Sequence, residues 1–253
     1  MRIFLKTEDE IILLRAASQL ATRALIEVGR HVVPRLALSH LRNKVVNAVM
    51  RTVPTESNSG KEALSSDTEF TFFVNGAYIE PSLEGECMLC EGDWLTVNCW
   101  VCLDGYYSFG AHTFIVGSSQ DDEPMISTLR DMLRQVVRRA SAGHSIKEMS
   151  RTVYSLHSHD PYVLQKTFGH GVGRNRVENP ILRMNPGVND TVLLKEGMCL
   201  VIAFAFKHGR SHLIKPRLMH ESTFHNPFVP FGTTVVVRPG RPEILTSFET
   251  IVK

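Results

Sequence analysis

The sequence contains no apolar run of about 18 residues, the length that a helix needs to cross a bilayer. It also lacks a long run of charge of one sign, since 28 Lys and Arg residues nearly balance 26 Asp and Glu residues. This composition gives no indication of binding to nucleic acid or to an acidic membrane surface. No apolar signal-peptide core stands between Arg2 and Glu8, so we expect a cytoplasmic protein without membrane contact.

Cysteine is scarce, and its five residues are an odd number for a framework of paired disulfides. Two Cys-x-x-Cys pairs, Cys87 with Cys90 and Cys99 with Cys102, imitate the spacing of a zinc knuckle. The pattern over 95–102 is typical of a strand, however, and residues three apart on a strand point to opposite faces. We therefore predict buried structural cysteines rather than a zinc site.

The N-terminal part of the chain predicts two helices. Residues 7–10 form a capping box of Thr and Glu, and the apolar spacing that follows predicts a helix ending near Pro34. A second helix is expected at 39–50. The polar segment 55–67, rich in Ser, Glu and Gly, is predicted to be a flexible loop.

Beyond this loop, helical and strand patterns alternate. Strands are predicted at 70–74, 93–97 and 113–116, with a hairpin turn at Asp104-Gly105, then helices at 125–137 and 145–156, then strands at 192–194, 199–202 and 233–237. The order of two helices followed by strands thus occurs twice. It predicts an α+β fold in one domain, residues 1–253, with two related halves whose helices lie outside a curved antiparallel sheet.

One glycine-rich segment, Gly169-His170-Gly171-Val172-Gly173, surrounds a single histidine, and a charged run follows it to Pro180. Alternating glycines allow the backbone to approach a neighbour that a Cβ would exclude. Arg174 stands where a dinucleotide-binding fingerprint requires its last glycine, so the segment is not that motif. By itself, it is also compatible with a turn around a buried histidine.

Several segments, in the same order, resemble the methionine aminopeptidase, prolidase and creatinase family, whose members share the pita-bread fold. They are 5–11, 91–98, 104–106, 113–117, the glycine-rich segment, 194–198 and 243–246. The resemblance covers almost the whole chain, and the compact length is similar to that of the methionine aminopeptidase branch. It implies a pita-bread fold.

The resemblance also indicates where metal ligands would stand. Family peptidases hold two divalent ions with two aspartates, one histidine and two glutamates. Carried over to this sequence, those positions fall on Trp100, on or beside Phe109, and on His170, Ala203 and Gly232. Only His170 keeps a metal-binding side chain, whereas hard divalent ions prefer carboxylate oxygens. We therefore expect no bound metal, no other cofactor and no working dinuclear aminopeptidase.

Two further active-site histidines of the family fall on Glu80 and Val177, and the acid beside the second remains as Glu178. The creatinase branch implies that the family histidine can act as an acid or base without metal. Our first hypothesis is therefore a metal-independent enzyme of specialised metabolism, in which His170 moves a proton with help from Glu80 and His112. Isomerisation, cyclisation, elimination and hydrolysis of a small acyl or peptidyl substrate remain open.

The surrounding side chains have a predicted binding role. We expect Trp100, Phe109, Tyr107 and Glu178 to contact the substrate. The alternative hypothesis is a catalytically inactive pseudopeptidase that binds peptides or proteins, with His170 as a core histidine. Both hypotheses are compatible with a homodimer.

Six further histidines, at 157 and 159 and within 207–226, are predicted to be surface residues. His157 and His159 stand near a helix end, where they suit a capping role. The basic segment 207–226 carries four histidines at irregular spacing, which favours an exposed loop over a metal site. Its positive charge could steer an anionic substrate toward the site.

Overall fold

The computed structural model describes residues 2–53, 64–117, 124–157, 163–164, 167–185, 192–207 and 228–247. Its helices are α1 (Glu8–His31), α2 (Leu38–Thr52), the short 3₁₀ helix η2 (Pro81–Leu83), α3 (Pro124–Arg138) and α4 (Ile146–His157). Its strands are β1 (Glu69–Val74), β2 (Ala77–Tyr78), β3 (Trp94–Leu103), β4 (Tyr106–Ile115), β5 (Val163–Leu164), β6 (Thr167–Gly171), β7 (Glu178–Arg183), β8 (Cys199–Lys207), β9 (Phe228–Val236) and β10 (Glu243–Ile244). The predicted order, two helices and then strands, twice over, is confirmed.

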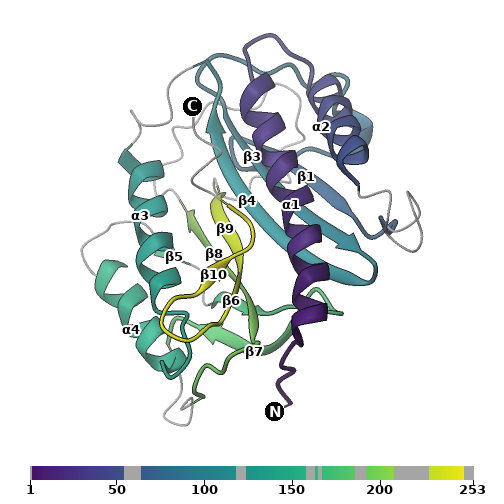
Figure 1. Cartoon of the computed structure of the whole chain (residues 1–253). Helices are drawn as coiled ribbons and strands as arrows, with labels where there is room; N and C mark the ends of the chain where they lie inside the picture. Colours follow the sequence, from purple (N-terminus) through teal and green to yellow (C-terminus); the bar gives the residue numbers. More distant parts are fainter. Residues whose placement is uncertain are drawn as a thin grey trace.

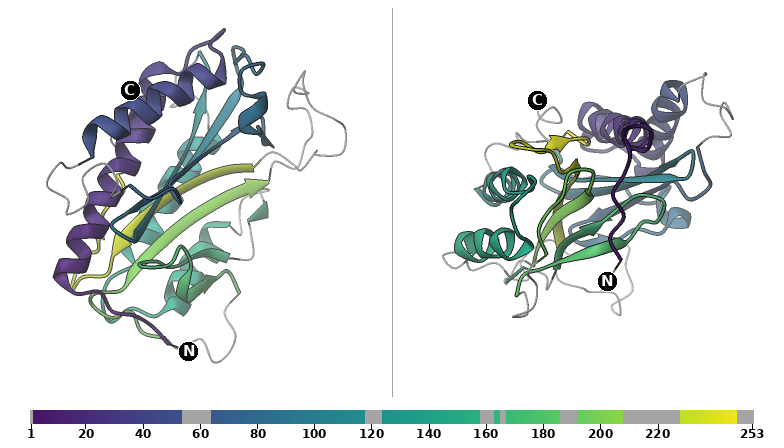
Figure 2. Two further views of the ribbon diagram at one scale, coloured as in Figure 1. Left: turned by 90° about the vertical axis from the view of Figure 1, so that its right-hand side faces the viewer. Right: turned by 60° about the horizontal axis from the view of Figure 1, so that its bottom comes forward.

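These strands form one antiparallel sheet in the order β2-β1-β3-β4-β9-β8-β6-β7, with β10 beside β9 and β5 beside β8. The β3–β4 hairpin turns at Asp104 and Gly105, whose φ angles of 49° and 77° suit a tight hairpin turn. The sheet is curved, with α1 and α2 beside its N-terminal strands and α3 and α4 beside its C-terminal strands (Figures 1 and 2). This arrangement confirms the predicted α+β class.

Local sequence explains how α1 begins. The Thr7 hydroxyl accepts a hydrogen bond from the Glu10 amide at 3.3 Å, and the Glu10 carboxylate accepts one from the Thr7 amide at 3.0 Å. The capping box is therefore confirmed. Neither α1 nor any other helix in the described ranges is both long and apolar enough to cross a membrane.

Apolar side chains pack between the sheet and each helix pair. One core joins α1 and α2 to β1, β3 and β4, and a second joins α3 and α4 to β8 and β9. A third, smaller cluster includes Phe109 and Val201 and has Trp100 and Ala203 at its margin. This third cluster surrounds the candidate site.

Two segments differ from the predicted pattern. Residues 192–194 do not form a strand, because Leu193 makes only an isolated bridge to Ser145 before the chain turns at Gly197. The glycine-rich segment enters strand β6 and is not simply a turn. A Cβ on Gly169 would clash with the carbonyl oxygen of Val201 in the neighbouring strand, which explains the glycine there. Of the predicted loop, residues 55–63 lie outside the described ranges.

Candidate functional site

Three aromatic rings come together from strands β3, β4 and β6 of the curved sheet. Trp100 on β3 stands opposite Phe109 on β4, with ring centroids 4.7 Å apart. The His170 ring on β6 lies 6.1 Å from the Trp100 ring and is tilted from it by only 10°. We call Trp100, Phe109 and His170 the ring cluster.

Two small residues border the ring cluster. Ala203 on β8 pairs with Gly232 on β9, and Gly232 also pairs with Ala111 on β4. A Cβ added to Gly232 would lie 2.6 Å from Cε1 of Phe109 and 2.9 Å from Cβ of Ala203. The Phe109 ring therefore fills the volume that a side chain at position 232 would need.

His170 is the only titratable member of the ring cluster. Its Nδ1 lies 2.8 Å from the carbonyl oxygen of Gly171. Because a carbonyl can only accept, Nδ1 carries the proton and Nε2 is left as an acceptor. Burial lowers the pKa of His170 below its usual value, and the bond to Gly171 opposes this shift only in part. The imidazole is therefore neutral at neutral pH.

A buried ion pair holds the glycine-rich segment in place. Lys6 Nζ lies 2.6 Å from Glu178 Oε2, and both side chains are only 5% exposed. Glu178 also accepts a hydrogen bond from the Asn175 amide at 3.1 Å. A Cβ on Gly173 would clash with the end of the Lys6 side chain and with Glu178 Oε1, so a larger residue there would disturb this pair. The Glu178 carboxylate is thus bonded to Lys6 and to the Asn175 amide, and its contact with a substrate stays a prediction.

Polar groups surround the outer edge of Trp100. The Arg176 guanidinium lies 5.6 Å from the centroid of Trp100 and 5.8 Å from that of Tyr107. It bonds Glu69 Oε2 at 2.8 Å and donates to the carbonyl oxygen of Asp67. The Tyr107 hydroxyl donates to Asp67 Oδ2 at 2.6 Å, and this bond raises the pKa of Tyr107 to about 12.

Two predicted catalytic residues are not brought to His170. Glu80 is exposed and directly precedes η2. It follows β2, which pairs with the Phe73 end of β1. Trp100 pairs with Glu69 at the other end of β1. Within the described ranges, no hydrogen bond or ion pair joins Glu80 to His170.

His112 lies on the opposite face of β4 from Phe109. It is fully buried between the rings of Phe114 and Phe231, at centroid distances of 4.7 and 4.6 Å. Gly110, on the same side of the strand as His112, faces Leu25 of α1. Strand alternation therefore places the His112 ring toward the helices and away from the ring cluster.

The cysteine pairs do not form a metal centre. Cys99 and Cys102 are buried, Cys90 is exposed, and burial raises the pKa of Cys87 to about 11. No three His, Cys, Asp or Glu side chains within the described ranges gather closely enough to hold an ion. His159 and positions 208–226 of the histidine-rich segment lie outside those ranges.

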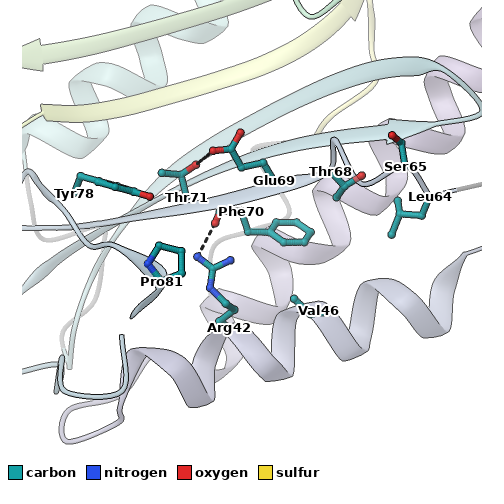
Figure 3. A pocket seen from close by; sticks show the side chains of 10 residues that line it. All are labelled: Arg42, Val46, Leu64, Ser65, Thr68, Glu69, Phe70, Thr71, Tyr78 and Pro81. Atoms are coloured by element: carbon teal, nitrogen blue, oxygen red, sulfur yellow. Dashed lines mark hydrogen bonds between the residues drawn. The ribbon is translucent and has the colours of Figure 1, made fainter. Parts of the chain in front are cut away.

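A separate cavity of about 330 Å³ opens beside α2, along the part of β1 that β2 does not pair (Figure 3). Arg42 lies at its wall, where it donates to the carbonyl oxygen of Phe70 at 2.8 Å and to Glu84 at 2.6 Å. Glu69, which binds Arg176, also lines this cavity. Glu69 therefore contributes both to the wall of this cavity and to the polar group beside Trp100.

A curved antiparallel sheet with a helix pair beside each half, and a side-chain cluster to which both halves contribute strands, defines a protein of the pita-bread class. The sequence model of metallopeptidase family M24 matches residues 12–237, so the chain belongs to that family. The family resemblance seen in the sequence is therefore confirmed.

The individual relatives agree with this assignment. The methionine aminopeptidase of Helicobacter pylori (strain ATCC 700392 / 26695) is 28% identical over 225 residues, which cover 85% of this chain and 87% of the relative. That of Borreliella burgdorferi is 24% identical over 254 residues, covering 97% and 98%.

Solved structures confirm the pita-bread fold. The methionine aminopeptidase of Thermotoga maritima has a TM-score of 0.79 at 20% identity, covering 97% of this chain and all of the other. The prolidase of Pyrococcus furiosus has a TM-score of 0.72 at 19% identity, covering 97% of this chain and 66% of the other. At these identities the likeness concerns the fold alone.

Proposed function

We propose that this M24-family protein is a metal-independent pseudopeptidase that binds a peptidyl ligand over the ring cluster. One observation carries the proposal: the Phe109 ring fills the space beside Gly232, at a position where the family resemblance implies a metal-binding carboxylate. Peptide binding is favoured because aromatic rings offer a large and rigid apolar contact area.

The side chains of this site do not fit two divalent metal ions. The resemblance implies five ligands, whose positions here carry Trp100, Phe109, His170, Ala203 and Gly232. A catalytic metal needs about three protein ligands, and these residues offer a single imidazole. Glu178, an acid eight positions after His170, does not add a free ligand, because its carboxylate forms an ion pair with Lys6 at 2.6 Å. We therefore derive no metal-dependent step.

Binding is favoured over catalysis because, among the residues that the structure describes, no acidic or basic side chain forms a hydrogen bond or ion pair with His170. A catalytic histidine is usually oriented by a carboxylate, as in the serine-protease triad. Here Nδ1 bonds the carbonyl oxygen of Gly171, while Glu80 and His112 lie elsewhere. The site thus offers an aromatic surface with one hydrogen-bond acceptor.

The second candidate function is acid–base catalysis by His170 on a small acyl or peptidyl substrate. One observation favours it: the imidazole is neutral and presents Nε2 as an acceptor beside the Trp100 ring. Such a group can remove a proton in an isomerisation, cyclisation, elimination or hydrolysis.

Trp100 offers a direct test, because the chain has only two tryptophans. A Trp94→Phe variant leaves Trp100 as the sole indole, and we expect its fluorescence to change saturably on titration with the peptide Met-Ala-Ser. No free methionine should be released, with or without added Mn²⁺ or Co²⁺. The matched control is a Trp94→Phe/Phe109→Leu variant, in which binding should weaken because the apolar contact is reduced.

The outcomes separate the candidates. Stoichiometric metal uptake with metal-dependent release of methionine would overturn the proposal. Absence of a saturable fluorescence change would overturn peptide binding at this cluster. Metal-independent turnover of the peptide that is lost in His170→Gln, with an unchanged thermal transition, would favour the catalytic candidate.

A further inference from the structure

Arg176 is held at the edge of the ring cluster by contacts typical of a bound cation. Its guanidinium lies over the rings of Trp100 and Tyr107, at 5.6 and 5.8 Å from their centroids. It also forms a 2.8 Å ion pair with Glu69. We call the Trp100 face, the Tyr107 face and the Glu69 carboxylate the ring–carboxylate subsite.

The chemistry of this subsite is selective for cations. The negative faces of aromatic rings attract guanidinium and ammonium groups, and a carboxylate adds charge-assisted hydrogen bonds. Arg176 draws on both, and its ion pair lowers the pKa of Glu69, so this carboxylate stays ionised. A neutral group would gain weaker contacts with the rings and the carboxylate, and an anionic group would be repelled by both.

Arg176 can be exchanged, because its bonds to Glu69 and to the carbonyl oxygen of Asp67 both lie at the surface. Its side chain is 36% exposed and that of Glu69 is 52% exposed. Ion pairs between exposed side chains contribute little to stability. A ligand cation can therefore take the place of Arg176 without breaking a buried pair such as Lys6–Glu178.

Space for the rest of such a ligand lies next to Glu69. The cavity of about 330 Å³ is lined by Glu69 and Thr71 and by the apolar side chains of Val46 and Leu64 (Figure 3). A peptide that places a cationic side chain against Glu69 can therefore extend along the part of β1 that β2 does not pair.

We propose that the ring–carboxylate subsite binds the guanidinium or ammonium group of a cationic peptidyl ligand, and that Arg176 is a built-in occupant which this ligand displaces. The inference rests on the proposed function, because it names the ligand class of the same site. It makes Arg176 a competitor of the ligand rather than a contact for it.

The test uses the Trp94→Phe protein, whose Trp100 fluorescence reports on the subsite. The probes are Nα-acetyl-arginine amide and its neutral isostere Nα-acetyl-citrulline amide. Because a tethered competitor acts at an effective concentration in the millimolar range, we expect Arg176→Ala to bind the arginine probe on the order of tenfold more tightly. The citrulline probe should bind weakly to both proteins.

Arg174→Ala is the matched control. Arg174 belongs to the same segment and carries the same charge, but its guanidinium lies over Tyr106 and within 3.8 Å of Glu10. Its removal should leave the affinity for the arginine probe unchanged. Adding Glu69→Gln to Arg176→Ala should abolish the gain.

Equal affinity of Arg176→Ala for the two probes, or an equal gain in Arg174→Ala, would overturn the proposal. So would weaker binding of the arginine probe after Arg176→Ala with an unchanged thermal transition, because Arg176 would then contribute to binding. These outcomes leave the binding of Met-Ala-Ser by the parent protein intact, so they are distinct from a failure of the proposed function.

Discussion

Cε1 of Phe109 lies 2.6 Å from the point that a Cβ on Gly232 would occupy, so the two residues share one volume across β4 and β9. Gly232→Ala should therefore overpack the site and lower the free energy of unfolding by about 1–3 kcal/mol. Urea denaturation, with the midpoint and slope compared between variant and parent, measures this loss.

The cause of the loss can be isolated with a second substitution. In a Phe109→Leu background the ring is gone, and Gly232→Ala should cost less than in the parent protein. The expected double-mutant coupling is about 1 kcal/mol or more, since the two residues are in contact. Additive losses would mean that the Phe109 ring does not limit the space at position 232.

The Thr234 hydroxyl fixes the backbone beneath the Phe109 ring. It accepts from the Phe109 amide and donates to the Phe109 carbonyl, each at 2.9 Å, and both residues are buried. The Phe109 carbonyl also accepts from the Thr246 hydroxyl at 3.0 Å, so Thr234→Val leaves the buried Phe109 amide as the unsatisfied group. This variant should cost about 1–3 kcal/mol and should alter Trp100 fluorescence in the Trp94→Phe protein. Thr233→Val is the control, since Thr233 bonds Thr246 instead and should leave that fluorescence unchanged.

The Lys6–Glu178 pair should contribute strongly to stability, because both partners are buried. Lys6→Met leaves the Glu178 carboxylate without its counter-charge, and breaking a buried pair typically costs about 3–5 kcal/mol. The free energy of unfolding measures this loss, and the Lys6→Met/Glu178→Gln double variant should recover much of it. If Lys6→Met alone were as stable as the parent protein, the pair would not hold the glycine-rich segment.

Short-range patterns predicted much of the fold. The capping box between Thr7 and Glu10 and the turn at Asp104-Gly105 are local, so a few adjacent residues determine them. The conformation of residues 192–194, by contrast, depends on a contact with a distant part of the chain. Leu193 makes its only bridge to Ser145, a contact between distant segments that the apolar spacing of three residues cannot indicate.

The candidate site was predicted in part. The family resemblance led us to expect Trp100, Phe109 and His170 at one place, and the structure brings them together. His112 and Phe109 are three residues apart on one strand, like Cys99 and Cys102, so their side chains point to opposite faces of the sheet. The same rule that we applied to the cysteines could therefore have indicated that His112 faces the helices.

The contact between Arg176 and Glu69 could not be predicted in this way. It joins residues 107 positions apart, and it depends on how the glycine-rich segment approaches the end of β1. Arg176 lies within a charged run that the sequence does display, but no spacing rule assigns its partner. Only the pairing of β1 with β3 places Glu69 beside Trp100.

Protonation of His170 should destabilise the protein below neutral pH. Burial lowers the pKa of His170 in the folded state, whereas the unfolded chain has the ordinary value of about 6.5. Between these two values the unfolded state binds more protons, so the free energy of unfolding falls as the pH drops through this window. Above about pH 6.5 the imidazole is neutral in both states and makes no such contribution.

The expected result is a pH-dependent difference between parent and His170→Gln. Urea denaturation at pH 7.5 and pH 5 should show the parent protein losing stability relative to the variant as the pH falls. The imidazole proton resonance of His170, assigned by its absence in the variant, should titrate below the usual histidine midpoint. Because the His170 and Trp100 rings stack at 6.1 Å, Trp100 fluorescence should change over the same range. A midpoint at or above the ordinary value, with no relative loss of stability, would mean that the imidazole is solvated and not buried against the indole.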